Sequence, residues 1–210
     1  MILQHRLSSS EVPPDFKELF RYAGFSWQTL ENNNCTDSQM QELAQTAVNE
    51  LREKINCRSV YEKFPLEVTA DEIIRFAGKE IKSHHLSLNL RGCHSVYLFA
   101  ATLGPEVDKL IQRTSKINQA KAVMLQAGGA MFIEQYVELL QIFLRQEEEK
   151  NHNFIRPRYS PGYGDVTLEA QKIFFELLQC QKNLALTLND SLIMSPEKSV
   201  TAFIGVSQTK

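Results

Sequence analysis

The segment with the clearest capacity for chemistry is Arg158-Tyr159-Ser160-Pro161-Gly162-Tyr163-Gly164-Asp165. The guanidinium of Arg158 offers a planar fork of donors that suits a carboxylate. Gly162 and Gly164 carry no Cβ, so backbone groups there can approach a ligand closely. The two tyrosines offer flat faces and hydroxyls, which suit an aromatic ring or a cationic centre. A sulfonium amino acid would use all of these groups, and the alternative is an ordinary tight turn with exposed aromatic side chains.

Two predicted helices flank this segment. The apolar periodicity predicts a long helix from about residue 118 to residue 149. Gly128-Gly129 in its middle indicates a close backbone approach or a local break, or a helix slightly weakened and held by its neighbours. After the segment, a helix is expected from 166 to about 182, and Asp165 or Thr167 could cap it.

The rest of the chain predicts a mixture of helices and strands. Helices are expected at 15–23, at 36–55 with Thr36 and Gln39 as a capping box, at 83–90 and at 105–112. Strands are expected within 59–76 and at 95–101, 184–188 and 200–206. Because no regular βαβ rhythm is present, we expect one α+β domain over residues 1–210, with a mostly antiparallel, twisted sheet flanked by helices. Residues 1–57 would form its helical N-terminal part, and residues 58–210 would supply the sheet, the long helix and the ligand loop.

The order of residues around the segment resembles a known family. The pattern is Arg-x-x-x-Gly-Tyr, a helix ending near Leu-Leu, a strand, Ser191-x-x-Met194, a turn with Pro196, and Ser199-Val200-Thr201. It is similar to the C-terminal part of the activation domain of cobalamin-dependent methionine synthase. The likeness is looser from Phe64 to Glu138, and the chain looks like a short stand-alone relative of that domain.

This resemblance implies a binding site for S-adenosylmethionine. The family binds this ligand through the Arg and the Gly-Tyr of the motif, and the matching loop residues here are Arg158, Ser160, Gly162 and Tyr163. A ligand-contacting glutamate on the preceding helix has Glu134 as its counterpart, with Glu138 as a rival. An acidic contact near the start of the domain has Asp15 as its nearest counterpart.

The resemblance also implies a role in repairing a corrinoid cofactor. The domain would hold S-adenosylmethionine so that its methyl group faces reduced cobalt on a separate methionine synthase or related corrinoid methyltransferase. A flavodoxin-like protein is a candidate electron donor. Cobalamin would be reached only through the partner, because the chain lacks the Asp-x-His-x-x-Gly motif of corrinoid-binding domains. The chain would thus be at most a component of the methyltransferase, and the alternative is a docking or S-adenosylmethionine-sensing protein without methyl transfer.

Composition and spacing argue against other functions. A formal net charge of -2 gives no general attraction to nucleic acid. No apolar run approaches the roughly 20 residues of a membrane span, and the N-terminus lacks the apolar core of a signal peptide, so a cytoplasmic protein is expected. The four cysteines include no Cys-x-x-Cys pair, which favours reduced thiols over a metal site. His84-His85 is expected at the surface, and the run Glu147-Glu148-Glu149 is expected to be solvated.

Overall fold

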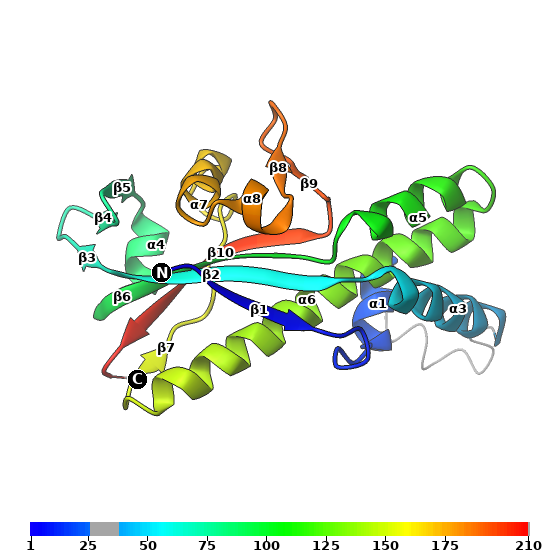
Figure 1. The fold of residues 1–210 in the computed structure, drawn as a ribbon, viewed down its shortest axis with the longest axis horizontal. Helices are drawn as coiled ribbons and strands as arrows, with labels where there is room; N and C mark the ends of the chain where they lie inside the picture. Colours follow the sequence, from blue (N-terminus) through cyan, green and yellow to red (C-terminus); the bar gives the residue numbers. More distant parts are fainter. Residues whose placement is uncertain (26–37, 210) are drawn as a thin grey trace.

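The structure is a computed structural model that describes residues 1–25 and 38–209. Its centre is a five-stranded antiparallel sheet in the order β1-β2-β6-β10-β7 (Figure 1). These strands are β1 (Leu3–Leu7), β2 (Cys57–Pro65), β6 (Cys93–Thr102), β10 (Ser199–Ser207) and β7 (Phe154–Ile155). Smaller sheets are formed by β3 (Glu67–Val68), β4 (Ile73–Phe76) and β5 (Lys79–Lys82), and by β8 (Thr187–Leu188) and β9 (Met194–Ser195). The expected α+β fold with a mostly antiparallel sheet is confirmed.

Both faces of the central strands are buried. Successive side chains of a strand point to opposite faces. In β6, Tyr97, Phe99 and Ala101 belong to one apolar cluster, and Leu98 and Ala100 belong to another. Each face of the sheet therefore needs its own layer of helices.

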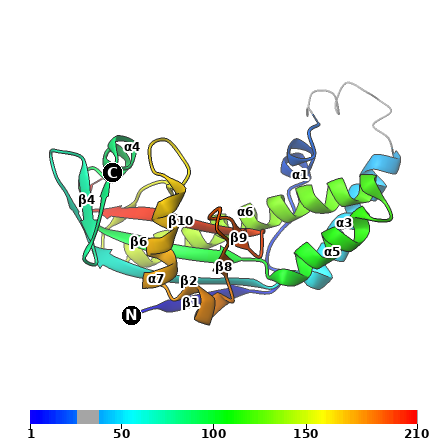
Figure 2. The same ribbon diagram turned by 90° about the horizontal axis from the view of Figure 1, so that it is seen from above.

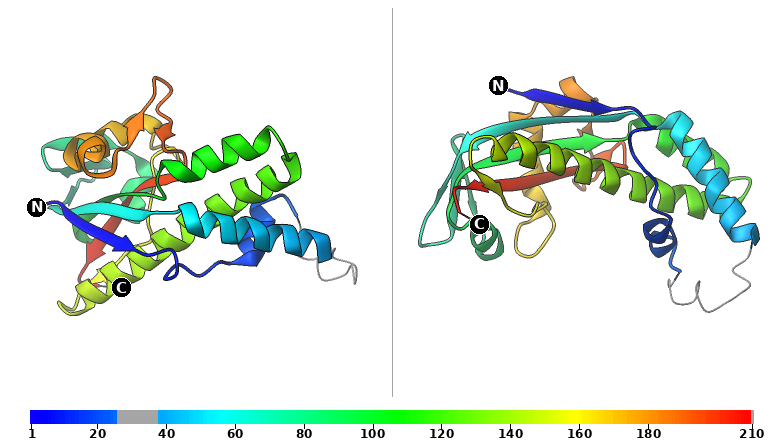
Figure 3. Two further views of the ribbon diagram at one scale, coloured as in Figure 1. Left: turned by 45° about the vertical axis from the view of Figure 1, so that its right-hand side comes forward. Right: turned by 90° about the horizontal axis from the view of Figure 1, so that it is seen from below.

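The long helix α6 (Gln119–Glu149) covers the first face. It crosses the sheet and continues beyond it, where it packs against α1 (Phe16–Tyr22), α3 (Ser38–Lys54) and α5 (Pro105–Ser115) (Figure 3). The helix is unbroken at Gly128-Gly129. A Cβ on Gly128 would lie 2.6 Å from the Leu51 side chain, so this glycine allows a close approach of α3.

Short helices cover the second face (Figure 2). They are α4 (His84–Asn89), a 3-10 helix η1 (Leu168–Ala170), α7 (Gln171–Leu177) and α8 (Cys180–Leu184). Phe174 of α7 packs against Phe203 of β10 with a ring-centroid distance of 4.5 Å. The segment after α6 must therefore pass from one face of the sheet to the other.

Several local expectations are wrong. Residues 3–7 form strand β1 and not part of a helical segment. The helix expected over 166–182 is divided into η1, α7 and α8, because Gln179 adopts a left-handed backbone conformation with φ of 49° between the last two. The strand expected at 184–188 is reduced to Thr187–Leu188. Thr36 of the expected capping box lies outside the described residues.

The expectation of a solvated acidic run is wrong for Glu148, which is only 3% exposed. Its Oε1 accepts hydrogen bonds from Lys63 Nζ at 2.7 Å and Tyr97 Oη at 2.5 Å, and its Oε2 accepts from Asn153 Nδ2 at 2.8 Å. Burial opposes ionisation of Glu148, but these donors outweigh it and hold its pKa below the ordinary value. The carboxylate therefore ties the end of α6 to β2 and β6.

We predict that Glu148→Gln lowers the free energy of unfolding by about 2 kcal/mol at pH 7, because Lys63 loses its charged partner. A carboxylate with a lowered folded pKa contributes stability above its ordinary pKa of 4.5, and that contribution is lost as pH falls. The deficit of the variant should therefore shrink below pH 4.5 in urea titrations. Glu149→Gln, at an exposed neighbour, is the control, and equal stability of the two variants at pH 7 would contradict the prediction.

Candidate functional site

The segment after α6 extends the sheet along β10. Arg156 donates its backbone N–H to the Gly205 carbonyl at 2.8 Å, and Tyr159 exchanges two backbone hydrogen bonds with Phe203 at 2.8 and 2.9 Å. Because side chains alternate along an extended segment, Tyr159 packs on the second face of the sheet and Arg158 points toward α6 on the first face. The backbone pairing thus determines where Arg158 can reach.

Arg158 lies between two carboxylates of α6. Its Nη2 donates to Glu134 Oε2 at 2.5 Å, and its Nη1 donates to Glu138 Oε2 at 3.1 Å. Glu134 and Glu138 share one side of the helix because they are four residues apart. One guanidinium beside two carboxylates leaves one unbalanced negative charge. We call this group of Arg158, Glu134 and Glu138 the charged wall.

The turn after Arg158 depends on two glycines in the left-handed region. Gly162 has φ of +92°, and a Cβ there would lie 3.0 Å from the Leu168 side chain. Gly164 has φ of +54°, and a Cβ there would lie 2.4 Å from the Tyr159 hydroxyl. Both glycines are needed for the conformation of the turn, because a side chain at either position would be strained.

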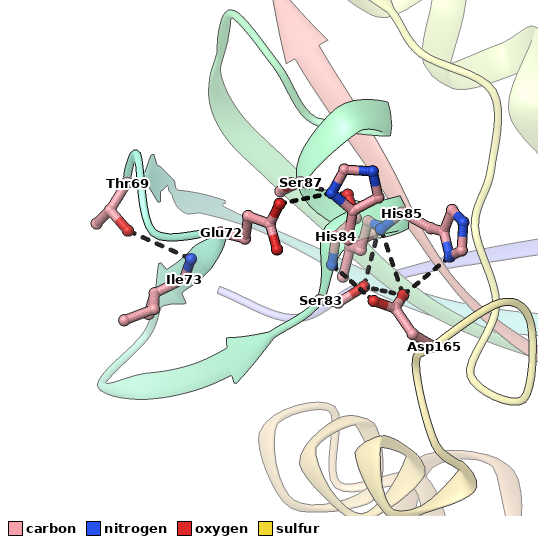
Figure 4. A network of polar contacts seen from close by, with 9 residues as sticks. Thr69, Glu72, Ile73, Ser83, His84, His85, Ser87 and Asp165 are labelled. Carbon is pink, nitrogen blue, oxygen red and sulfur yellow. Dashed lines mark hydrogen bonds and ion pairs between the residues drawn. The ribbon is translucent and has the colours of Figure 1, made fainter.

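Asp165 fixes the end of the turn (Figure 4). Its carboxylate accepts from the Ser83 hydroxyl at 2.5 Å, from the His84 N–H at 2.7 Å and from the His85 N–H at 3.3 Å. The Ser83 hydroxyl first, and then the two backbone donors, lower the pKa of Asp165 to about 2. Asp165 therefore joins the turn to the start of α4, and neither it nor Thr167 makes the side-chain capping bond expected for the helix that follows.

These elements enclose a cleft of about 320 Å³ at the β10 edge of the sheet. The lining residues are Glu134, Arg158, Tyr159, Ser160, Pro161, Tyr163, Gln171, Met194, Ser199, Val200 and Thr201. They come from α6, the turn, the start of α7, strand β9 and the first half of β10. The volume and the mixture of apolar surface with a few polar groups suit a small-molecule ligand.

Comparisons with known proteins identify the family of the chain and a solved structure with a similar fold. The sequence model of the vitamin B12 dependent methionine synthase activation domain matches residues 89–209, more than half of the chain. The chain belongs to this family. A crystal structure of the MetH reactivation domain bound to AdoHcy has a similar fold, with a TM-score of 0.74 and 17% sequence identity over 98% of this chain and 78% of that chain. No curated protein matches the chain by sequence.

The structure of this activation domain brings most of the sequence-predicted site residues together. Glu134, Arg158, Ser160 and Tyr163 line the cleft, and Gly162 lies between two lining residues. Tyr163 is 70% exposed. Asp15 is not among the residues that line the cleft, and its carboxylate accepts from the Glu18 N–H at 3.1 Å and caps α1.

The sequence did not indicate that Gln171 lines the cleft. Met194 and Ser199-Val200-Thr201 were recognised as part of the family pattern but were not assigned to the site. The positions of Met194 and Thr201 in the family pattern were a usable signal, because both follow the loop in the same order. Gln171 had no comparable signal, since a glutamine at the start of a helix is ordinarily solvated.

The described residues contain neither a metal-binding cluster nor a membrane-spanning helix. Within residues 1–25 and 38–209, no three His, Cys, Asp or Glu side chains could together hold a metal ion. None of the helices in that part of the chain is long and apolar enough to cross a membrane. His84 and His85 are more than half exposed and face different carboxylates, Glu72 and Asp165.

We predict that Asp165→Ala loosens the turn without unfolding the activation domain. Amide hydrogens of His84, Gly162 and Val166 should exchange about tenfold faster, because the carboxylate that joins the turn to α4 is gone. Hydrogen exchange followed by NMR measures this, with Asp190→Ala, at an exposed site in another turn, as the control. Identical exchange in the two variants would show that Asp165 does not hold the turn.

Proposed function

We propose that this activation domain binds S-adenosylmethionine in the cleft and presents its methyl group to the reduced corrinoid of another protein. The observation that carries the proposal is the meeting of Arg158, Glu134 and the Gly162-Tyr163 turn at one cleft. Membership of the methionine synthase activation family supports it, as does the fold shared with a reactivation domain that binds AdoHcy.

The charges of the cleft suit this ligand. S-adenosylmethionine carries a sulfonium, an ammonium and a carboxylate, and is therefore a net monocation. Arg158 offers remaining N–H donors to the carboxylate, while Glu134 and Glu138 attract the ammonium. The unbalanced negative charge of this wall favours a monocation over a neutral or anionic ligand.

The turn would position the rest of the ligand. Backbone groups around Ser160 and Gly162 can donate to or accept from polar atoms of the ligand. The exposed ring of Tyr163 gives a face for the sulfonium or an aromatic ring. The residues of this chain would therefore bind and orient S-adenosylmethionine and exclude water around its methyl group.

Methyl transfer itself requires no acid or base from this domain. Reduced cobalt on the partner supplies the electron pair for the new bond, and sulfur keeps the pair of the broken S–C bond, so S-adenosylhomocysteine leaves. The partner would be a methionine synthase or related corrinoid methyltransferase in the cytoplasm, with a flavodoxin-like protein as the source of electrons. Cobalamin would be held by that partner, because this sequence has no Asp-x-His-x-x-Gly motif.

We predict that the wild-type protein binds both S-adenosylmethionine and S-adenosylhomocysteine in calorimetric titrations. Arg158→Ala should weaken S-adenosylmethionine binding at least tenfold, about 1.4 kcal/mol, because a charge-assisted contact to the ligand carboxylate is lost. The control is Arg156→Ala, since Arg156 lies in the same segment, contacts the Arg91 carbonyl and is outside the cleft.

Two results of the titrations would count against the proposal. If the folded wild-type protein bound neither ligand, the domain would be a docking protein that retains only the fold. If Arg158→Ala and Arg156→Ala bound as tightly as the wild-type protein, Arg158 would not belong to the site.

A further inference from the structure

The cleft contains a buried polar group whose bonding is incomplete. Gln171, the first residue of α7, lines the cleft and is only 6% exposed. Its Oε1 is buried and has no hydrogen-bond partner within residues 1–25 and 38–209. A buried acceptor without a partner destabilises the folded protein. A rotation of this side chain toward the cleft would bring Oε1 to a donor of a bound ligand and give it the missing partner.

Gln171 and the charged wall lie on opposite sides of the cleft. Glu134 belongs to α6 on the first face of the sheet, whereas Gln171 belongs to α7 on the second face (Figure 1). The cleft lining also includes the apolar side chains of Pro161 and Met194, outside α6. A ligand that places its amino-acid end on Arg158 would therefore bring its uncharged end toward Gln171.

We infer that Gln171 recognises the adenine ring of S-adenosylmethionine, an inference that rests on the function proposed above. A glutamine amide holds an acceptor and a donor side by side, which matches the exocyclic amine and the ring nitrogen N7 of adenine. Oε1 accepts from the amine, and Nε2 donates to N7. The thioether of Met194 and the ring of Pro161 supply apolar surface for the flat base.

This arrangement makes Gln171 a specificity residue for the base. Replacing the amine by a carbonyl group, as in S-inosylhomocysteine, removes the donor that Oε1 needs. A site built to hydrogen-bond a ligand group discriminates strongly against an analogue that lacks it, because the buried partner is left unpaired. The wild-type protein should therefore bind S-adenosylhomocysteine at least tenfold more tightly than S-inosylhomocysteine.

The test compares these two ligands on the wild-type protein and on Gln171→Leu. The variant should lose about tenfold in affinity for S-adenosylhomocysteine and should lose most of the preference over S-inosylhomocysteine. Gln141→Leu is the matched control, because Gln141 is also buried with an unpartnered Oε1 but lies on α6 outside the cleft. Gln171→Met is made in parallel, so that the result does not depend on one variant folding.

These titrations distinguish failure of the inference from failure of the proposed function. Loss of the preference in the Gln171 variants, with Gln141→Leu unchanged, supports the inference. If the wild-type protein binds S-adenosylhomocysteine and the Gln171 variants keep the full affinity and preference, the inference is wrong while the proposed function stands. If the wild-type protein binds neither ligand, the proposed function fails and this inference fails with it.

Discussion

The backbone pairing between Tyr159 and Phe203 is the interaction on which the site depends. It holds the segment after α6 against the edge of β10 and determines which side chains face each layer of helices. Arg158 is thereby placed on the α6 side, and the turn that follows must pass to the α7 side. The Asp165 carboxylate then fixes the far end of the turn on α4. The cleft exists because this short segment is held at both ends.

The position of the cleft at the sheet edge gives it two dissimilar walls. One wall comes from α6 and carries Arg158 with Glu134 and Glu138. The other comes from α7 and β9 and is uncharged, and it contains the unpartnered amide oxygen of Gln171. A ligand with a zwitterionic end and a heterocyclic end matches this division better than a ligand of uniform polarity. The proposed ligand and the proposed specificity residue thus follow from the same feature of the fold.

The sequence predicted the elements whose patterns are long and regular. The helix over 118–149 and the strands near 95–101 and 200–206 correspond to α6, β6 and β10 with small changes at their ends. Strand β1 was missed because it is a largely exposed edge strand with a polar sequence. The break at Gln179 was missed because no glycine marks the left-handed residue.

The candidate site was only partly predictable, because some of its residues are neighbours in the sequence and others meet only in the fold. Arg158, Ser160, Gly162 and Tyr163 are neighbours in the sequence, so their order carried the family pattern. Contacts between distant residues left no such local signal. The burial of Glu148 depends on Lys63 and Tyr97, and the role of Asp165 depends on Ser83 and α4. Asp15 had only its position near the start of the chain as a signal, and its carboxylate caps α1 in the fold.

We propose that this domain presents bound S-adenosylmethionine so that its methyl group is transferred to the corrinoid of a partner. The most direct measurement follows the cobalt absorption spectrum in a reconstitution with a reductant and S-adenosylmethionine. It compares this protein alone with cobalamin, a corrinoid protein without an activation domain, and the two proteins together. Our account predicts the spectral change of cobalt methylation only when both proteins are present. Equal methylation without this protein, or methylation of free cobalamin by this protein alone, would contradict it.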